Sequence, residues 1–135
     1  MLDHLGGPIG IGGYAGRRDE VFEEWKVGID DVASCPTVAM KLGGIGMEWY
    51  FGMGWNEHDT PPSSEHVAEY WGEWLRYAIE AFGPDRCMFE SNFPFDRASL
   101  PYSVLWNAFQ IVAADYSDAD QDELFAGTAR RVYKL

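Results

Sequence analysis

Basic residues are scarce in this sequence. Its 135 residues include 10 Lys and Arg against 22 Asp and Glu, which gives a formal net charge of −12. A field of this sign repels the phosphates of nucleic acids and of anionic lipids. The acidic residues are scattered along amphipathic stretches, as on an ordinary solvated surface. The composition therefore predicts a protein that binds neither nucleic acid nor membrane.

Cysteines and long hydrophobic runs are scarce as well. The two cysteines, Cys35 and Cys87, form no CxxC pattern, which argues against a thiolate metal cluster and a disulfide framework. We expect both to be buried, reduced thiols. No stretch approaches the roughly 20 apolar residues of a membrane span, and no basic, apolar leader resembles a secretory signal. A cytoplasmic location is the resulting expectation.

Apolar and aromatic residues, by contrast, are plentiful. Hydrophobic residues make up 47% of the chain and aromatic residues 16%. This supplies enough apolar surface to offset the conformational entropy that ordering the chain costs. A chain of this length accommodates one core, so we expect residues 1–135 to form a single unit.

Periodicity predicts an alternation of helices and strands. Apolar residues recur at three- and four-residue spacing in four stretches, which predicts helices over 19–33, 64–82, 102–114 and 118–135, the last with a break at Gly127. Strands are expected to end near Asp3 and to cover 37–42 and 86–92. Because helical crossovers connect parallel strands, the fold class is α/β.

Polar residues stand where the predicted strands end. Asp3 and His4 end the first strand, Lys41 ends the second, and Asn92 ends the third, with Asp96 shortly after it. In parallel α/β folds, the working residues lie at these strand ends. From spacing alone, His4 is either a ligand or proton-transfer group or a structural, hydrogen-bonded histidine. Asn92 and Asp96 are equally open, because both residue types favour turns.

Four segments of the chain resemble a known family. They are LDHLGGP at 2–8, VAMKLGG at 38–44, RCMFESNFP at 86–94 and GTARRVY at 127–133. Together they resemble the amidohydrolase-related proteins of the pyrone-dicarboxylate lactonase type, in the order of that family's last three strands. The resemblance covers essentially the whole chain. It implies the C-terminal portion, about three βα units, of a (β/α)₈ TIM-type barrel that hydrolyses lactones, amides or related bonds, or decarboxylates aromatic acids.

The resemblance also suggests roles for individual residues. It carries the family's later histidine onto His4, as a ligand of a divalent metal (zinc or similar) or of a substrate carbonyl, and makes Lys41 a candidate substrate contact. The eighth-strand aspartate of the family falls on Asn92, whose amide cannot act as a base. Glu90 or Asp96 could supply the missing carboxylate if the loop bends back. The family's His-x-His pair occurs nowhere in the sequence.

A long loop at 43–63 is rich in glycine and aromatic residues, and loops of this length are often functional. Its residues Trp49 and Trp55 are candidate substrate contacts, either in a lid over an apolar or aromatic substrate or in packing under the barrel mouth. Both readings stay open.

The expected function is that of a hydrolase that attacks a small carboxylate, lactone or aromatic-acid-like substrate with activated water. A (β/α)₈ barrel takes about 250 residues, so the isolated chain is expected to be inactive and to require a missing N-terminal half. One alternative is a non-catalytic half-barrel that pairs as a homo-oligomer through its open sheet edges. Another is a decarboxylase of the same family.

Overall fold

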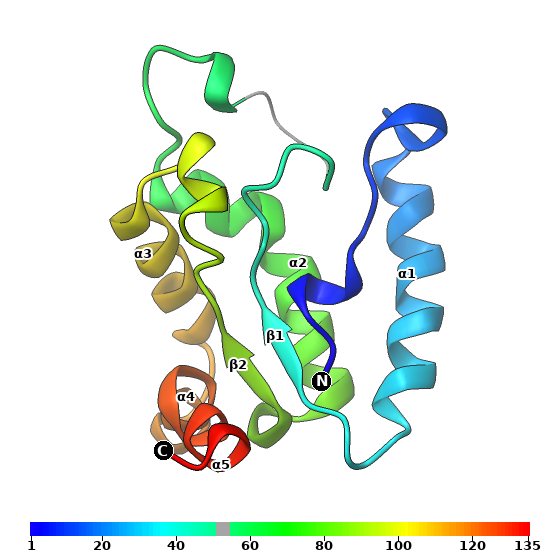
Figure 1. The fold of residues 1–135 in the computed structure, drawn as a ribbon, viewed down its shortest axis with the longest axis vertical. Helices are drawn as coiled ribbons and strands as arrows, with labels where there is room; N and C mark the ends of the chain where they lie inside the picture. The colour runs from blue at the N-terminus through cyan, green and yellow to red at the C-terminus, as the bar shows by residue number, and fades with distance from the viewer. Residues whose placement is uncertain (51–54) are drawn as a thin grey trace.

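Helices and strands alternate along the chain as expected (Figure 1). The computed structural model describes residues 1–50 and 55–135. Within those residues, no helix is long and apolar enough to cross a membrane. The regular elements are α1 (Arg18–Ala33), β1 (Met40–Leu42), α2 (Ser64–Phe82), β2 (Cys87–Phe89), α3 (Tyr102–Ala113), α4 (Asp118–Asp122) and α5 (Thr128–Tyr133).

The strands are parallel, which confirms the α/β prediction. In β1 and β2, Met40 lies opposite Cys87. The N-terminal segment joins β1 on its other side through a parallel bridge between Leu2 and Met40, and the amide of Lys41 donates to the carbonyl oxygen of Leu2 at 2.9 Å. Figure 1 shows α2 behind the strands with α1 and α3 on either side of it. The three strand segments therefore end at one edge, where the loops gather.

Both strands are shorter than the predicted 37–42 and 86–92 because their flanks take other conformations. Before them, Arg86 donates from Nη1 to the carbonyl oxygens of Ala33 (3.1 Å) and Cys35 (3.0 Å), and from Nε to that of Phe82 (2.8 Å). Arg86 itself ends a 3-10 turn at Pro84–Arg86, and Thr37 lies in the turn after α1, so both strands begin later than predicted. At the other end, Asn92 adopts a left-handed conformation with φ of 50°, which no strand can contain.

Removing the Arg86 guanidinium is expected to destabilise the fold. Arg86→Met removes the donor from three carbonyl groups, two of them in partly buried contacts, so we expect the free energy of unfolding to fall by about 2–3 kcal/mol. Urea unfolding followed by circular dichroism measures this. The matched control is Arg130→Met, because Arg130 is exposed and makes no side-chain hydrogen bond to the described residues. Equal stability of the two variants would contradict the assignment.

Aromatic rings fill the core between the helices and the strands. Trp71 and Trp74 of α2 are fully buried, and Phe22 and Trp25 of α1 pack on Trp74 with ring centroids 4.6 and 4.8 Å away. The amphipathic pattern of α2 therefore points to the core, as predicted. Cys87 is buried as expected.

The expectation for the other cysteine was wrong: Cys35 is exposed. It follows the C-terminal end of α1, in the turn whose carbonyl groups Arg86 binds. Its backbone is therefore held in place while its side chain faces solvent.

The predicted helix break at Gly127 was also wrong. A π-helical turn at Glu123–Gly127 connects α4 to α5, and Gly127 is helical with φ of −59° and ψ of −51°. A Cβ atom at this position would approach Glu123 Oε2 to 2.4 Å. That carboxylate pairs with Arg131 at 2.8 Å. The glycine therefore makes room for an ion pair across the helix.

Candidate active site

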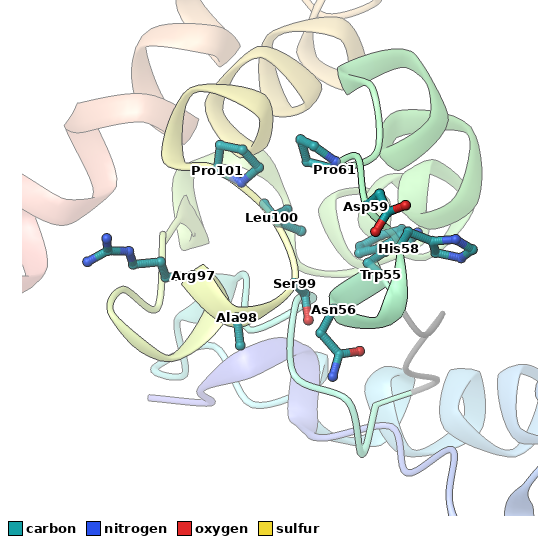
Figure 2. A pocket seen from close by; sticks show the side chains of 10 residues that line it. All are labelled: Trp55, Asn56, His58, Asp59, Pro61, Arg97, Ala98, Ser99, Leu100 and Pro101. Carbon is teal, nitrogen blue, oxygen red and sulfur yellow. The ribbon is translucent and has the colours of Figure 1, made fainter.

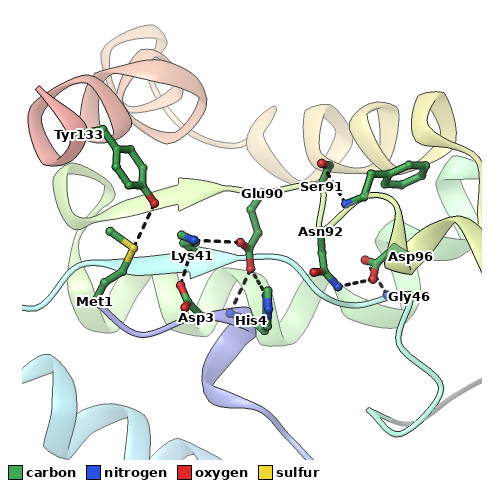
Figure 3. Close-up of polar contacts among 11 residues, drawn as sticks. Met1, Asp3, His4, Lys41, Gly46, Glu90, Ser91, Asn92, Asp96 and Tyr133 are labelled. Carbon is green, nitrogen blue, oxygen red and sulfur yellow. Dashed lines mark hydrogen bonds and ion pairs between the residues drawn. The ribbon is translucent and has the colours of Figure 1, made fainter. Parts of the chain in front are cut away.

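Polar side chains gather at the C-terminal ends of the three strand segments (Figure 3). Alternate residues of a strand point to opposite faces. Met40 and Leu42 are fully buried in the core, and Lys41 between them points to the opposite face. His4, Glu90 and Asn92 lie on the same side, in two hydrogen-bonded groups.

The first group joins residues from all three strand segments. Glu90 Oε1 accepts a hydrogen bond from the backbone N–H of His4 at 3.1 Å, and the same oxygen is in hydrogen-bond contact with Nδ1 of the His4 ring. Its other oxygen, Oε2, lies 3.6 Å from Lys41 Nζ, and Lys41 Nζ lies 3.1 Å from Asp3 Oδ1. The Glu90 side chain is 14% exposed and that of His4 is 32% exposed. Asp3, Lys41 and Glu90 thus form a row of alternating charges that ends at the His4 ring, which solvent can reach.

The ammonium group of Lys41 is held in its charged form. Burial acts to lower its pKa, but the contacts with Asp3, Tyr133 and Glu90 outweigh burial and raise the pKa above its ordinary value. A protonated Lys41 is a fixed positive charge beside Glu90, and it has no lone pair with which to act as a nucleophile or base.

The second group is centred on Asp96, which is fully buried. Its Oδ1 accepts a hydrogen bond from Asn92 Nδ2 at 2.7 Å, and its Oδ2 accepts one from the Gly46 backbone N–H at 3.1 Å. Burial raises the pKa of Asp96 to about 6, although both hydrogen bonds and nearby His4 act to lower it. The loop after β2 does bend back, so Asp96 lies beside Asn92, where the sequence lacks a carboxylate.

The glycines that follow β1 bring the backbone into direct contact with both groups. A Cβ atom on Gly43 would lie 2.3 Å from Glu90 atoms, one on Gly44 would lie 2.8 Å from His4 Cβ, and one on Gly46 would lie 2.8 Å from Asp96 Cβ. Sequence reasoning missed this function of the glycines. The signal was present, because glycines directly after a strand often mark a close backbone approach.

Tyr50 was missed as well. Its hydroxyl lies beside Gly7, where a Cβ atom would be 3.1 Å from it. Burial raises the pKa of Tyr50, and the carboxylates of Glu90 and Asp96 raise it further. A neutral phenol therefore borders the carboxylates and can donate a hydrogen bond there.

The two tryptophans proposed as substrate contacts lie in different places. Trp49 is 47% exposed and lines a cleft of about 260 Å³ together with Gly46 and Phe95. Trp55 is buried, with its ring 6.2 Å from that of Tyr70, and it borders a different cleft (Figure 2). The Trp49 cleft includes Gly46, whose N–H binds the Asp96 carboxylate, whereas the Trp55 cleft includes Ser99, whose N–H donates to the backbone carbonyl oxygen of Asp96. The intervening residues 51–54 lie outside the described residues.

The described residues do not make up a metal site. Among residues 1–50 and 55–135, no three His, Cys, Asp or Glu side chains are placed to hold an ion. The contacts of the carboxylates explain why. Glu90 contacts the His4 ring and the Lys41 ammonium, and the positive charge of Lys41 opposes the binding of a cation. Both oxygens of Asp96 already accept hydrogen bonds. His4 Nε2 is one free ligand position, so a metal would need ligands from outside these residues.

Comparisons with known proteins identify the family of the chain. The model of the Amidohydro_2 family, described as amidohydrolase, matches residues 1–135. The y4mH protein of Sinorhizobium fredii is 36% identical over 114 residues, which are 84% of this chain and 34% of that protein. The L-fucono-1,5-lactonase of Burkholderia multivorans is 29% identical over 136 residues, which cover 100% of this chain and 43% of the lactonase.

Solved structures show the same fold. A crystal structure of an amidohydrolase from Burkholderia multivorans with bound HEPES has a TM-score of 0.81 and 27% identity, over 99% of this chain and 44% of that one. Another, with bound zinc, has a TM-score of 0.78 and 26% identity, over 98% and 43%. The chain thus spans less than half the length of the relatives it matches.

Proposed function

Because this chain belongs to the amidohydrolase family, we propose that it forms the C-terminal part, about three βα units, of a (β/α)₈ barrel hydrolase. The proposed substrate is a lactone or a related small carboxylate-type molecule, which activated water opens. The similarity to an L-fucono-1,5-lactonase supports a sugar lactone as the first substrate to try. The remaining strands of the barrel would come from outside this chain.

The observation that carries this proposal is the placement of Asp96. Its carboxylate is buried beside Asn92 at the end of β2, and its pKa of about 6 lies close to neutral pH. A carboxylate with such a pKa is ionised at pH 7–8 and still accepts a proton better than an ordinary aspartate, which suits a general base. We assign Asp96 this role, and we assign Asn92 the task of orienting it.

His4 and Trp49 complete the proposed site. The His4 ring is partly exposed and provides a second polar group toward the water or the substrate carbonyl. Trp49 and Phe95 offer apolar surface beside Gly46, on which a ring-shaped substrate can rest. In the reaction, water adds to the lactone carbonyl, Asp96 takes one proton of the water, and the ring C–O bond breaks. The proton then passes to the departing oxygen, which gives a hydroxy acid.

Hydrolysis of sugar lactones by the natural protein that carries this chain tests the proposal. A pH indicator follows the proton that the hydroxy acid releases, with L-fucono-1,5-lactone and related 1,5-lactones as substrates. We expect turnover, and we expect His4→Asn to lower the rate about 10²-fold or more. The control is His58→Asn, because His58 is exposed and its side chain makes no hydrogen bond to the described residues.

Three results would contradict the proposal. One is that no lactone is consumed by the wild-type protein. Another is full activity of a folded His4→Asn variant. The third is release of CO₂ from aromatic acids without any lactone turnover, which would favour the decarboxylase. A metal-free, inactive oligomer of the chain would instead support the non-catalytic half-barrel.

A further inference from the structure

We propose that Glu90 is a positioning residue that holds the His4 ring in the tautomer with its proton on Nδ1, and that Lys41 and Asp3 hold Glu90 for this task. The consequence for catalysis rests on the proposed function. The tautomer itself is a property of the folded chain and is measurable without a substrate.

Two donors of His4 meet one oxygen of Glu90. The backbone N–H and the ring nitrogen Nδ1 both contact Oε1, so the carboxylate fixes the main chain and the side chain of the same residue. This requires His4 to adopt a left-handed backbone with φ of 52°, and Leu5 follows with φ of 54°. Such conformations are uncommon for residues with a side chain and persist only where surrounding contacts impose them.

Charge determines which nitrogen carries the proton. Lys41 Nζ lies 3.6 Å from Oε2 and forms an ion pair with the carboxylate of Glu90, and an ionised carboxylate only accepts hydrogen bonds. The Nδ1 atom of His4 must therefore be the donor. In a neutral imidazole, this leaves the lone pair on Nε2, and the ring can accept a proton or bind an electrophile at that nitrogen.

Glu90 has little freedom to move away. It extends from the end of β2, where its amide donates to the Leu42 carbonyl oxygen at 3.1 Å, and Gly43 packs against its Cγ. Asp3 holds Lys41 from the other side at 3.1 Å. The neighbouring strands thus order the carboxylate before any substrate binds. The arrangement is similar to the carboxylate–imidazole pairs of hydrolytic enzymes. In those pairs, the carboxylate determines the tautomer of the imidazole and stabilises the imidazolium that forms.

The tautomer can be observed by ¹⁵N–¹H correlation spectra of the protein labelled at histidine. The chain contains only three histidines, His4, His58 and His66, so few signals need assignment, and a His4→Asn spectrum identifies the relevant one. At pH 8 we expect His4 to show a protonated Nδ1 and an unprotonated Nε2. A dominant Nε2–H form of His4 in the wild-type protein would overturn the inference without need of any variant.

Glu90→Gln gives a sharper expectation. The Lys41 ammonium only donates and therefore draws the glutamine carbonyl oxygen, which turns the NH₂ group toward Nδ1 at the cost of the hydrogen bond from the His4 backbone N–H. The His4 proton is then expected to move to Nε2, which a purely structural role of Glu90 does not predict. The control Glu24→Gln changes an exposed carboxylate of α1 and should leave the His4 signals unchanged. An unchanged tautomer in folded Glu90→Gln would contradict the positioning role.

Kinetics separate this inference from the proposed function. If the protein hydrolyses a lactone, Glu90→Gln should lower kcat about 10²-fold or more with little change in KM. If it hydrolyses none while His4 shows the Nδ1–H form, the proposed function fails and the positioning of His4 stands. If Glu90→Gln reverses the His4 tautomer but keeps a normal kcat, the tautomer of His4 is not needed for catalysis.

Discussion

Replacing Asp96 with asparagine is expected to lower the hydrolytic rate about 10²- to 10⁴-fold and, at the same time, to increase the free energy of unfolding at pH 8. The loss of rate follows because an amide cannot take a proton from water. The gain in stability follows because the wild-type protein buries a carboxylate that no cation contacts directly. Among residues 1–50 and 55–135, the donors to this carboxylate are the neutral groups of Asn92 and Gly46.

The pH dependence follows from the direction of the shift. Burial raises the pKa of Asp96 from 3.8 to about 6, so the folded state binds this proton more tightly than the unfolded state does. The resulting stabilisation is present below about pH 4 and is lost as the pH rises through 6. Above pH 6, the ionised group costs roughly 3 kcal/mol, from 1.36 kcal/mol for each pKa unit.

An asparagine fits the same contacts. Its carbonyl oxygen can accept the Gly46 N–H, and its NH₂ group can donate to the side-chain oxygen of Asn92 after that amide turns over. Asp96→Asn should therefore be about 2 kcal/mol more stable than the wild type at pH 8 and should lack the fall in stability between pH 4 and 6.

Urea unfolding at several pH values from 4 to 8, together with the lactone assay, measures both effects. The control is Asp31→Asn, because Asp31 is exposed at the end of α1 and its side chain makes no hydrogen bond to the described residues. A less stable Asp96→Asn variant would show that the carboxylate has a structural role. An active one would exclude Asp96 as the base.

The sequence was sufficient for the helices and for the order of the strands, because both depend on local pattern. The apolar spacing of 64–82 and the cap at Ser63, whose side chain accepts the His66 N–H at 3.2 Å, are encoded within a few residues. The polar residues at strand ends were also predicted, since parallel strands bring them to one edge. Lys41 and Glu90 lie together for this reason.

Contacts between distant segments could not be predicted. His4 and Glu90 are 86 residues apart, and Gly46 and Asp96 are 50 apart, so no local spacing encodes either pair. The turn after α1 has the same origin, because Arg86 reaches the Ala33 carbonyl oxygen from 53 residues away. Trp49 and Trp55 look alike in the sequence, and only the packing of Trp55 on α2 separates them.

Gly43→Ala is expected to be the most damaging small substitution near the site, with a loss of about 3 kcal/mol or more in the free energy of unfolding. The added Cβ atom would lie 2.3 Å from both Cγ and the backbone oxygen of Glu90. The side chain can move, but the backbone oxygen belongs to a residue whose amide is bonded to Leu42 across the sheet. Relief therefore requires β1 and β2 to separate at their C-terminal ends.

A matched pair of variants isolates this clash. Gly28→Ala adds the same methyl group on α1, where no atom lies within 4 Å, and should increase stability by about 0.5–1 kcal/mol because alanine favours the helix. Adding Glu90→Ala to Gly43→Ala removes the Cγ contact but leaves the oxygen, so most of the loss should persist. Full recovery in the double variant would show that only the side chain was crowded. Persistent loss would show that the clash is with the backbone oxygen of Glu90. The close contact at Gly43 would then be required both for the pairing of β1 with β2 and for the position of Glu90 beside His4.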